Sequence, residues 1–568
     1  MVLALLLPLA ACAGGSGTAA PAAPPTPRAA AASPISPLAP AALKGMLEVY
    51  AADSMMGREA GTIGNVKATD YLAARLKPLG LEPGGPNGSW FQEVPVARTV
   101  ADPKSTVRVG GTSFAFEKDF LLFGGVPQLK LGGTLTGENI PTVYGGRSGD
   151  KSVTLNPEDA AGKLVVLDPP VNQAGEPTWQ FWPTLDRAKW DKAAGIAIIG
   201  RQLLPDGIVD FLQQPGVFLA EDSVLPPAPA GTFLMMVTPA MAEQMLGAPT
   251  TSLKPGAAGR PVSASVRTTT EKVPTPSRNV IAIVRGSDPV LKNQYVAIGA
   301  HNDHIGMAPH PVDHDSLWAF NRVMRPRGAE SEPGTPTPEQ LTRIRAILDS
   351  LRKVHPARLD SVYNGADDDG SGSVSLLGMA DAFTKAKVKP KRSILFVWHT
   401  AEEKGLWGSQ WFTDHPTVPR DSIVAQLNMD MIGRGNAWDI EGGSPKYLQL
   451  VGSRRLSTEL GDLVEKVNTE GAFGFAFDYS YDANGHPANI YCRSDHYMYA
   501  RYGIPVTFFT TDVHPDYHQL TDEAAYIDYT KMARVADLVA NVGLQVANLD
   551  HRILVDKPKP DPKAQCQQ

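Results

Sequence analysis

The chain has 568 residues, of which 43% are hydrophobic and 20% charged, so it can bury a large core and is long enough for more than one domain. Its 53 basic and 59 acidic residues give a formal net charge of -6, and nothing in this balance points to a nucleic-acid partner. Three cysteines are too few for a disulfide-rich scaffold.

The first residues, MVLALLLPLAACAGG, form an apolar run that is too short to span a bilayer and is typical of an export signal. Leu9-Ala10-Ala11-Cys12 resembles the lipobox of bacterial lipoproteins, in which cleavage leaves an acylated cysteine at the N-terminus. No Lys or Arg precedes the run, which departs from that pattern, and a plain cleaved signal is the alternative. We expect residues 1–40 to be a signal and flexible tether. The product would be exported, periplasmic or anchored to the outer membrane, touching a membrane only through a lipid at Cys12.

Helical periodicity dominates residues 41–81, within a segment 41–101 that we assign to the first part of the main domain. From 102 to 270 the pattern changes to short β-type runs, such as 164–167 and 196–199, separated by Gly and Pro. We therefore expect a β-rich domain inserted at 102–270, with the main domain resuming at 271–550 and a polar tail at 551–568.

Strongly apolar runs recur in the main domain, at 279–284, 295–300, 393–398, 423–427 and 504–510. Continuous runs of this length suit strands buried on both faces, and helical patterns lie between them. The sequence thus predicts an α/β fold with a mixed, largely parallel central sheet flanked by helices. In such sheets ligands gather at the carboxyl ends of the strands, where the runs are followed by metal-capable side chains.

Residues 306–363 interrupt this pattern as an insertion with its own helix. Thr337-Pro338-Glu339-Gln340 has the form of a capping box with Pro in the first turn. The insertion could serve as a lid over the site or be a surface excursion, and the sequence leaves both readings open.

Three adjacent carboxylates, Asp367, Asp368 and Asp369, lie in a Gly-rich turn before a helical pattern. Asp and Ser are common at helix starts, so the turn alone has an ordinary structural explanation. Adjacent like charges are unfavourable without a positive partner, however. A carboxylate that bridges two cations is the functional alternative.

Two adjacent carboxylates, Glu402 and Glu403, follow an apolar run, although such a pair is most often a solvated surface feature. Adjacent side chains point in different directions, so one can bind a metal while the other accepts a proton from the metal's water. Asp430 stands in an apolar context, where an acid without a partner is unfavourable.

A histidine that follows a strand, as His301 does, is usually structural. It could also bind a metal through one ring nitrogen while Asp303 holds the other nitrogen. His304 is less informative, and His514 and His518 follow the last apolar run.

Six short motifs occur together in one order. They are HND at His301, GADD at Gly365, EEKGLWGS at Glu402, NMDMIGR at Asn428, SDH at Ser494 and HQLTD at His518. This set resembles the M28 family of zinc peptidases over nearly the whole chain outside the insertions, and Met56-Gly57-Arg58-Glu59 resembles the family's N-terminal region.

The resemblance implies the phosphorylase/hydrolase-like fold of zinc exopeptidases and two zinc ions. Asp368 would bridge the ions, His301 and Asp430 would complete one site, and Glu403 and His518 the other. Glu402 would be the general base, and Asp303 would be the partner of His301. Tyr491 would help to stabilise the oxyanion, with ordinary aromatic packing as the alternative. Asp495 would belong to the outer shell of the site.

The inserted domain, at 161–168 and 191–200, resembles the protease-associated (PA) domain, which implies no catalytic residue. The implied function is an aminopeptidase that acts on peptides, with a carboxypeptidase, a single-zinc glutaminyl cyclase or a receptor-like binding protein as alternatives. The preferred N-terminal residue and the oligomeric state stay open. Of the cysteines other than Cys12, Cys492 and Cys566 could form a bridge, but we expect a free, buried Cys492.

Overall fold

A computed structural model of the chain describes residues 35–122, 134–150, 155–172, 175–179, 185, 188–204, 209, 215–220, 233–564 and 566–568. The predicted signal, the lipobox and Cys12 lie outside these residues. Within the described ranges, no helix has both the length and the apolar character needed to cross a membrane.

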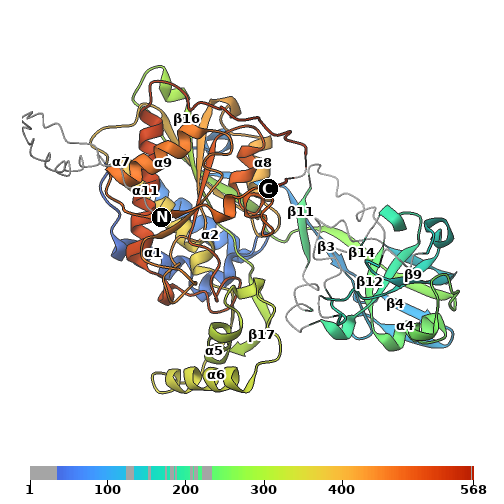
Figure 1. Cartoon of the computed structure of the whole chain (residues 1–568). Helices are drawn as coiled ribbons and strands as arrows, with labels where there is room; N and C mark the ends of the chain where they lie inside the picture. Colours follow the sequence, from blue (N-terminus) through green and yellow to red (C-terminus); the bar gives the residue numbers. More distant parts are fainter. Residues whose placement is uncertain are drawn as a thin grey trace, which may run out of the picture. The chain divides into compact units, whose positions relative to one another are not determined.

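A nine-stranded mixed sheet lies at the centre of the main domain, and its strand β16 is labelled in Figure 1. Its strands are β1 (Glu82–Pro83), β2 (Phe91–Val94), β15 (Ser277–Val284), β16 (Tyr295–His301), β19 (Ser393–His399), β20 (Ile423–Met429), β21 (Tyr447–Val451), β22 (Ala476–Asp478) and β23 (Val506–Thr510). Their order is β1-β15-β19-β16-β20-β23-β21-β22, and β2 also pairs with β15. The four central strands β19, β16, β20 and β23 are parallel, while β15 and β21 flank them antiparallel, which confirms the predicted α/β class.

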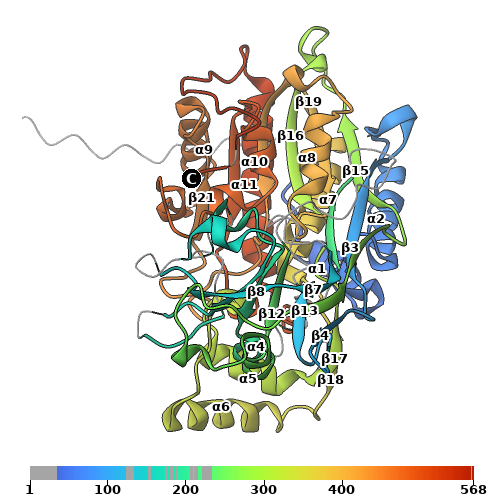
Figure 2. The same cartoon turned by 90° about the vertical axis from the view of Figure 1, so that its right-hand side faces the viewer.

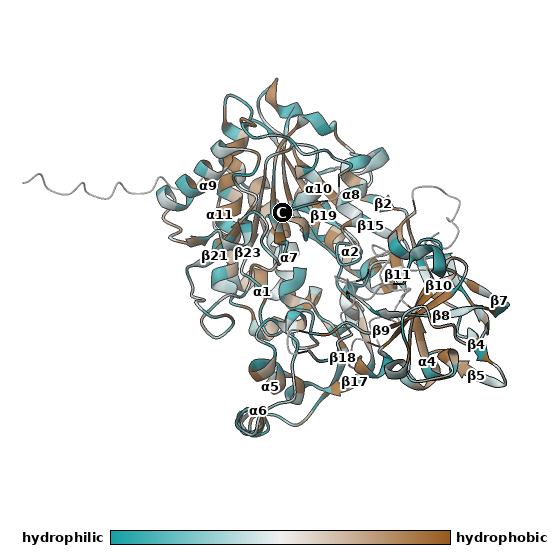
Figure 3. Ribbon diagram, turned by 45° about the vertical axis from the view of Figure 1, so that its right-hand side comes forward, coloured by the Kyte–Doolittle hydropathy of each residue, from teal (hydrophilic) through white to brown (hydrophobic). Residues whose placement is uncertain are grey.

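Helices cover both faces of this sheet, which explains why its four central strands are buried along their whole length. Along β15, Val280 and Ala282 join one buried core, whereas Ile281 and Ile283 join the other. The first core also contains residues of α1 (Pro40–Tyr50), α2 (Ile63–Leu76), α7 (Gly372–Thr384), α9 (Thr458–Glu470) and α11 (Tyr529–Asn548). The second core contains residues of α8 (Trp407–Asp414) and α10 (His496–Ala500) (Figure 2). The hydrophobic colouring of the enclosed strands follows from this burial (Figure 3).

The β-rich segment leaves and rejoins the main chain through two paired strands, β3 (Val96–Ala101) and β14 (Thr268–Lys272), with β11 (Gly216–Leu219) on the other side of β3. Between them, a five-stranded sheet contains β6 (Phe120–Leu122), β12 (Leu234–Val237), β10 (Gly195–Ile199), β9 (Leu164–Asp168) and β8 (Thr142–Arg147). A four-stranded sheet contains β5 (Thr112–Ala115), β4 (Thr106–Val109), β13 (Val262–Val266) and β7 (Leu135–Ile140). Both sheets and α4 (Pro239–Leu246) contribute to one hydrophobic core, so the segment has a core of its own. Its PA identity stays a prediction.

The insertion that follows β16 is built on paired strands β17 (Met307–Asp313) and β18 (Leu359–Val362), with α5 (His314–Met324) and α6 (Pro338–Leu351) between them. The predicted capping box at the start of α6 is confirmed. Gln340 N donates to Thr337 Oγ1 at 3.3 Å, and Thr337 N donates to Gln340 Oε1 at 2.8 Å.

Cys492 and Cys566 form a disulfide, with their Cα atoms 5.8 Å apart, so the expectation of a free Cys492 is wrong. The two cysteines are separated by 74 residues, and no local pattern reveals that the C-terminal tail returns to this loop. There the side chain of Gln568 accepts a hydrogen bond from Tyr491 N at 3.1 Å. The bridge therefore fastens the tail beside the SDH motif.

Reducing this disulfide is expected to lower the free energy of unfolding by about 2–4 kcal/mol, because the reduced unfolded chain regains the freedom that the bridge removes. The measurement is urea unfolding of the wild-type protein with and without reductant. The Cys492→Ser/Cys566→Ser variant serves as the control, since reductant should not shift its midpoint. Equal midpoints for oxidised and reduced wild-type protein would contradict the prediction.

Candidate functional site

The predicted metal-binding side chains meet at the edge formed by the carboxyl ends of the four parallel strands, as expected for an open α/β sheet. Each is placed by its own element. They are His301 at the end of β16, Glu403 after β19, Asp430 directly after β20, His518 in the loop after β23, and Asp368 in the turn η11 (Ala366–Ser371) before α7.

One group consists of His301, Asp368 and Asp430, all buried, whose donor atoms lie within 4.8 Å of one another. His301 Nε2 is 3.0 Å from Asp368 Oδ1 and 3.6 Å from Asp430 Oδ1. Although it is buried, His301 Nε2 has no hydrogen-bond partner. An imidazole nitrogen that faces two carboxylates in this way is suited to bind a cation placed between them.

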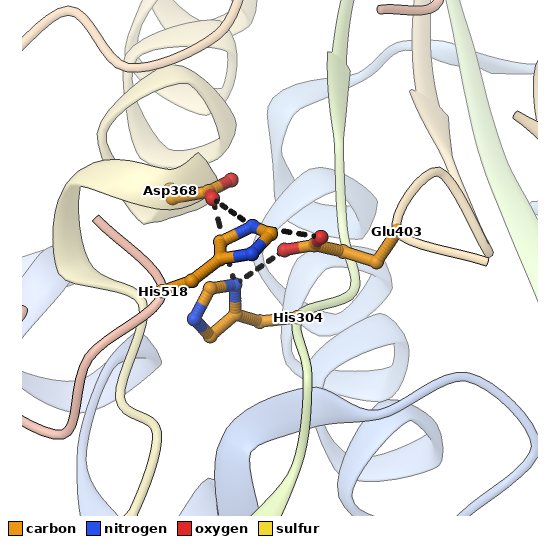
Figure 4. Close-up of side chains that lie close together, drawn as sticks. All are labelled: His304, Asp368, Glu403 and His518. Carbon is orange, nitrogen blue, oxygen red and sulfur yellow. Dashed lines mark hydrogen bonds and ion pairs between the residues drawn. The ribbon is translucent and has the colours of Figure 1, made fainter. Parts of the chain in front are cut away.

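A second group consists of His304, Asp368, Glu403 and His518 (Figure 4). His518 Nε2 is 3.0 Å from both Asp368 Oδ2 and Glu403 Oε2. His304 Nδ1 is 2.6 Å from Glu403 Oε1 and 3.9 Å from Asp368 Oδ2. The sequence prediction did not include His304, although its place in the loop after β16, three residues from His301, was the available signal.

Asp368 belongs to both groups and presents a different oxygen to each, Oδ1 to His301 and Oδ2 to His518. A carboxylate arranged in this way can bridge two cations. The two groups are therefore adjacent positions that share one ligand.

The charges of these buried residues require a positive partner. Burial alone would lower the pKa of His301, but Asp430 and Glu402 outweigh it and raise that pKa well above its ordinary value. Burial likewise opposes protonation of His518, yet Glu403 and Asp368 raise its pKa to about 10. Without metal, protons on the imidazoles provide positive charge, so divalent cations would replace these protons on binding.

The ring of His301 is oriented by Asp303, but through the main chain. His301 Nδ1 donates to the carbonyl oxygen of Asp303 at 3.1 Å. Since a carbonyl can only accept, Nδ1 carries a hydrogen, and Nε2, which faces Asp368, is the nitrogen left to bind a metal once its own proton is displaced. The Asp303 carboxylate lies farther away, with Oδ1 3.8 Å from His301 Nδ1, and accepts the backbone N–H of Glu402 at 3.1 Å.

The SDH motif positions the carboxylate of Asp430. Ser494 Oγ donates to Asp430 Oδ2 at 2.8 Å and accepts from Asn428 Nδ2 at 2.9 Å. The sequence left the role of Asp495 uncertain. Its Oδ2 lies 3.4 Å from Nδ1 of His399, which is the last residue of β19. These contacts fix the ends of β19 and β20 that carry the site.

Glu402 is buried to 9% exposure and lines a pocket together with Asp368, Glu403 and Asp430. Burial raises the pKa of its carboxyl well above the ordinary value, and the charges of Asp430 and Asp495 add to this effect. A carboxyl with this surrounding can hold a proton near neutral pH, as a general acid and base must.

Tyr491 is placed differently from the expectation for an oxyanion-stabilising group. Its buried ring packs beneath the guanidinium of Arg455 at 4.4 Å and near the rings of His496 and Tyr497. Of the described residues, those that line the pocket beside the metal-capable groups include Met431, Tyr481, Ile490, Phe508, Val513 and Tyr517, but not Tyr491. These contacts fit the packing alternative, and the oxyanion role of Tyr491 stays a prediction.

The turn that carries Asp368 is held by Arg58, a fully buried residue of the early Met-Gly-Arg-Glu motif. The Arg58 guanidinium donates to the carbonyl oxygens of Asn364 at 2.5 Å and Gly365 at 2.8 Å, with longer bonds to those of Asp368 and Tyr50. It also lies 4.8 Å from the centre of the Tyr50 ring. One side chain far away in sequence thereby fixes the backbone of the bridging carboxylate.

Asp522, the last residue of the HQLTD motif, holds the same turn from the other side. Its carboxylate accepts the backbone N–H groups of Asp367 at 3.0 and 3.1 Å and of Asp368 at 3.1 Å. The loop that brings His518 therefore also positions Asp368.

A third group of metal-capable side chains lies at the insertion and consists of His314, Asp360 and Glu523. Arg358 forms an ion pair with Asp360 at 3.3 Å and another with Glu523. Because these carboxylates already have a cationic partner, this group gives no comparable argument for a metal.

Comparison with known proteins shows that residues 279–543 match the model of Peptidase family M28. The chain is 28% identical over 216 residues to Leucine aminopeptidase 1 of Aspergillus fumigatus, covering 36% of this chain and 52% of that protein. It is 31% identical over 170 residues to Leucine aminopeptidase 1 of Sclerotinia sclerotiorum, covering 29% and 41%. The chain thus spans about half the length of the curated relatives it matches. Among solved structures, the aminopeptidase from Aneurinibacillus sp. strain AM-1 has a similar fold, with a TM-score of 0.50 and 17% identity over 92% of this chain and 97% of that one.

Replacing Arg58 by Met is expected to lower the free energy of unfolding by about 3–5 kcal/mol, because four buried carbonyl groups lose a charged donor. The variant should also retain less metal after dialysis, since the backbone of Asp368 is no longer fixed. Urea unfolding and metal analysis measure the two effects. Arg75→Met removes an exposed arginine of α2 and is the matched control. Equal behaviour of the two variants would contradict the role given to Arg58.

Proposed function

The chain carries a peptidase family M28 domain at residues 279–543, and from this premise we propose that it is a dinuclear-zinc aminopeptidase that removes residues from the free N-terminus of peptides. One observation carries the proposal. Two adjacent groups of buried imidazole and carboxylate donors share Asp368, each through a different oxygen atom.

The donor set supports zinc, because imidazole and carboxylate ligands in a small buried site suit this ion. In the proposed assignment, His301 and Asp430 hold one ion, Glu403 and His518 hold the other, and Asp368 bridges them. The hydrogen-bond-free Nε2 of His301 fits this role. When bound, such ions polarise a scissile carbonyl and lower the pKa of water to about 7.

Glu402 is the proposed general base. Its carboxylate removes a proton from the attacking water and then delivers that proton to the nitrogen of the leaving amine. The support is its position in the pocket wall next to Glu403 and Asp430, and the environment that raises its pKa. The Asp303 carboxylate, which accepts the backbone N–H of Glu402, keeps this side chain at the strand end.

The pocket next to these groups supports an apolar residue at the N-terminus of the substrate. Its walls include Met431, Ile490, Phe508 and Val513, and leucine aminopeptidases are among the relatives. Arg493 and Asp512 also line it, but Arg493 is paired with Glu330 at 2.5 Å. We therefore take leucyl substrates as the first choice for assay.

Export remains part of the proposal. The disulfide between Cys492 and Cys566 supports an oxidising compartment, because such bridges are rare in reducing cytosol. The sequence around Cys12 supports a lipid anchor, and mass analysis of the membrane-associated product tests it.

The activity itself is tested with a panel of substrates. Leucyl-p-nitroanilide and peptides with a free N-terminus should be cleaved by zinc-loaded protein, whereas N-acetylated forms of the same compounds should not. Treatment with a chelator should abolish cleavage, and added zinc should restore it. Release of C-terminal residues from N-acetylated peptides would instead identify a carboxypeptidase, and ring closure of glutaminyl peptides a cyclase.

Replacing Glu402 by Gln is expected to lower kcat by about 10²–10⁴-fold, because an amide cannot accept the proton of the water. Metal content should stay at the wild-type level, since this side chain is not one of the proposed ligands. Glu470→Gln, an exposed change at the end of α9, is the control for substitution of a glutamate. Wild-type turnover in the Glu402 variant would exclude it as the base.

A further inference from the structure

His304 lies at the centre of the site without a role in the mechanism above. It follows β16 by three residues, is fully buried, and forms an isolated β-bridge with Glu59. Its backbone N–H donates to the carbonyl oxygen of Arg58 at 3.4 Å. The main chain thus holds this histidine beside the same Arg58 that fixes the turn of Asp368.

The ring of His304 packs directly against the backbone of that turn. Gly365 has a φ of +53°, and a Cβ atom added there would lie 2.5 Å from both Cγ and Cδ2 of His304. Only glycine leaves room for the ring at this place. The ring therefore cannot move closer to the backbone of this turn. Its Nδ1 faces Glu403 and Asp368.

The four donor atoms of the second group are spaced as ligands of one ion would be. In a tetrahedral zinc site with bonds of about 2.0–2.1 Å, neighbouring donor atoms are about 3.3 Å apart. Four distances join these residues, at 2.6, 3.0, 3.0 and 3.9 Å, on both sides of that value, and Glu403 presents Oε1 to His304 but Oε2 to His518. The rings of His304 and His518 stand edge to face with centroids 5.6 Å apart, so both can direct a nitrogen at one point (Figure 4).

We propose that His304 is a further metal ligand, which binds through Nδ1 the ion held by Glu403 and His518. This inference rests on the proposed dinuclear site. It means that the two metal positions have different numbers of protein ligands. The group with His304 has four protein donors, the closed arrangement of a structural zinc site. The group of His301, Asp368 and Asp430 has three, which leaves a position for water or substrate.

The rival role for His304 is a hydrogen bond from Nδ1–H to Glu403 Oε1 at 2.6 Å, which would position this carboxylate without touching the ion. Asparagine can replace such a donor, since its amide nitrogen takes the place of Nδ1, but it is a poor zinc ligand. Cysteine is a strong ligand and gives a thiolate-to-cobalt absorption band when it binds Co²⁺. The two substitutions therefore separate the two roles.

The experiment measures Zn²⁺ stoichiometry and affinity by competition with a chromophoric chelator in the full chain and its variants. In His304→Ala and His304→Asn, one of the two ions should bind more weakly by at least the roughly 10–100-fold that loss of an outer-shell partner costs, while the other is unchanged. His310→Ala, an exposed histidine in β17, should match the wild type. Co²⁺-loaded His304→Cys should show a thiolate band that the wild type lacks, and any signal from the protein's own cysteines cancels in the difference spectrum.

Wild-type affinity in His304→Asn, or no thiolate band in a His304→Cys variant that still binds two Co²⁺ ions, would overturn the assignment of His304. A wild-type protein that binds no pair of ions would instead overturn the proposed function. The thermal unfolding midpoint of each metal-free variant shows that a loss of affinity is not a loss of folding.

Discussion

The structure depends on keeping several carboxylates together in a buried space. Asp368, Glu402, Glu403 and Asp430 all line one pocket, and burial disfavours their charged forms. The pKa of Glu402 and of Asp430 is raised, whereas neighbouring histidines hold the pKa of Asp368 well below its ordinary value and lower that of Glu403 to about 2. Imidazole groups and backbone N–H donors surround them, and two cations would complete the balance. The strands, the turn before α7 and the buried Arg58 all serve to hold these groups in place against their repulsion.

The main fold could be predicted from local patterns, and the same patterns marked several candidate ligands, but the full set of five proposed metal-binding positions came from the resemblance of six motifs to the M28 family. Strands buried on both faces are continuously apolar, and residues directly after parallel strands meet at one edge. His301 and Asp430 follow this rule, each at the end of its strand or one residue later. Asp368 was indicated by a different signal, namely the adjacent acidic residues in a turn. Their charges repel one another unless a positive group lies among them.

Other features depend on contacts that no local pattern reveals. His304 was set aside because a histidine one position beyond the Asn-Asp pair carries no periodic signal, yet Gly365 and Glu403 place it in the site. Tyr491 stands where the family resemblance expects a functional tyrosine, but its ring turns toward Arg455 and His496. The bridge to Cys566 required the path of the tail, which is a property of the folded chain alone.

The turn of Asp368 is fastened from both ends of the polypeptide, by Arg58 before the β-rich segment and by Asp522 after the last parallel strand. Long-range contacts of this kind form late, because most of the chain must be present before they can close. The groups of the site can therefore come together only after the chain has been made as far as residue 522, so this part of the fold cannot form on a shorter polypeptide.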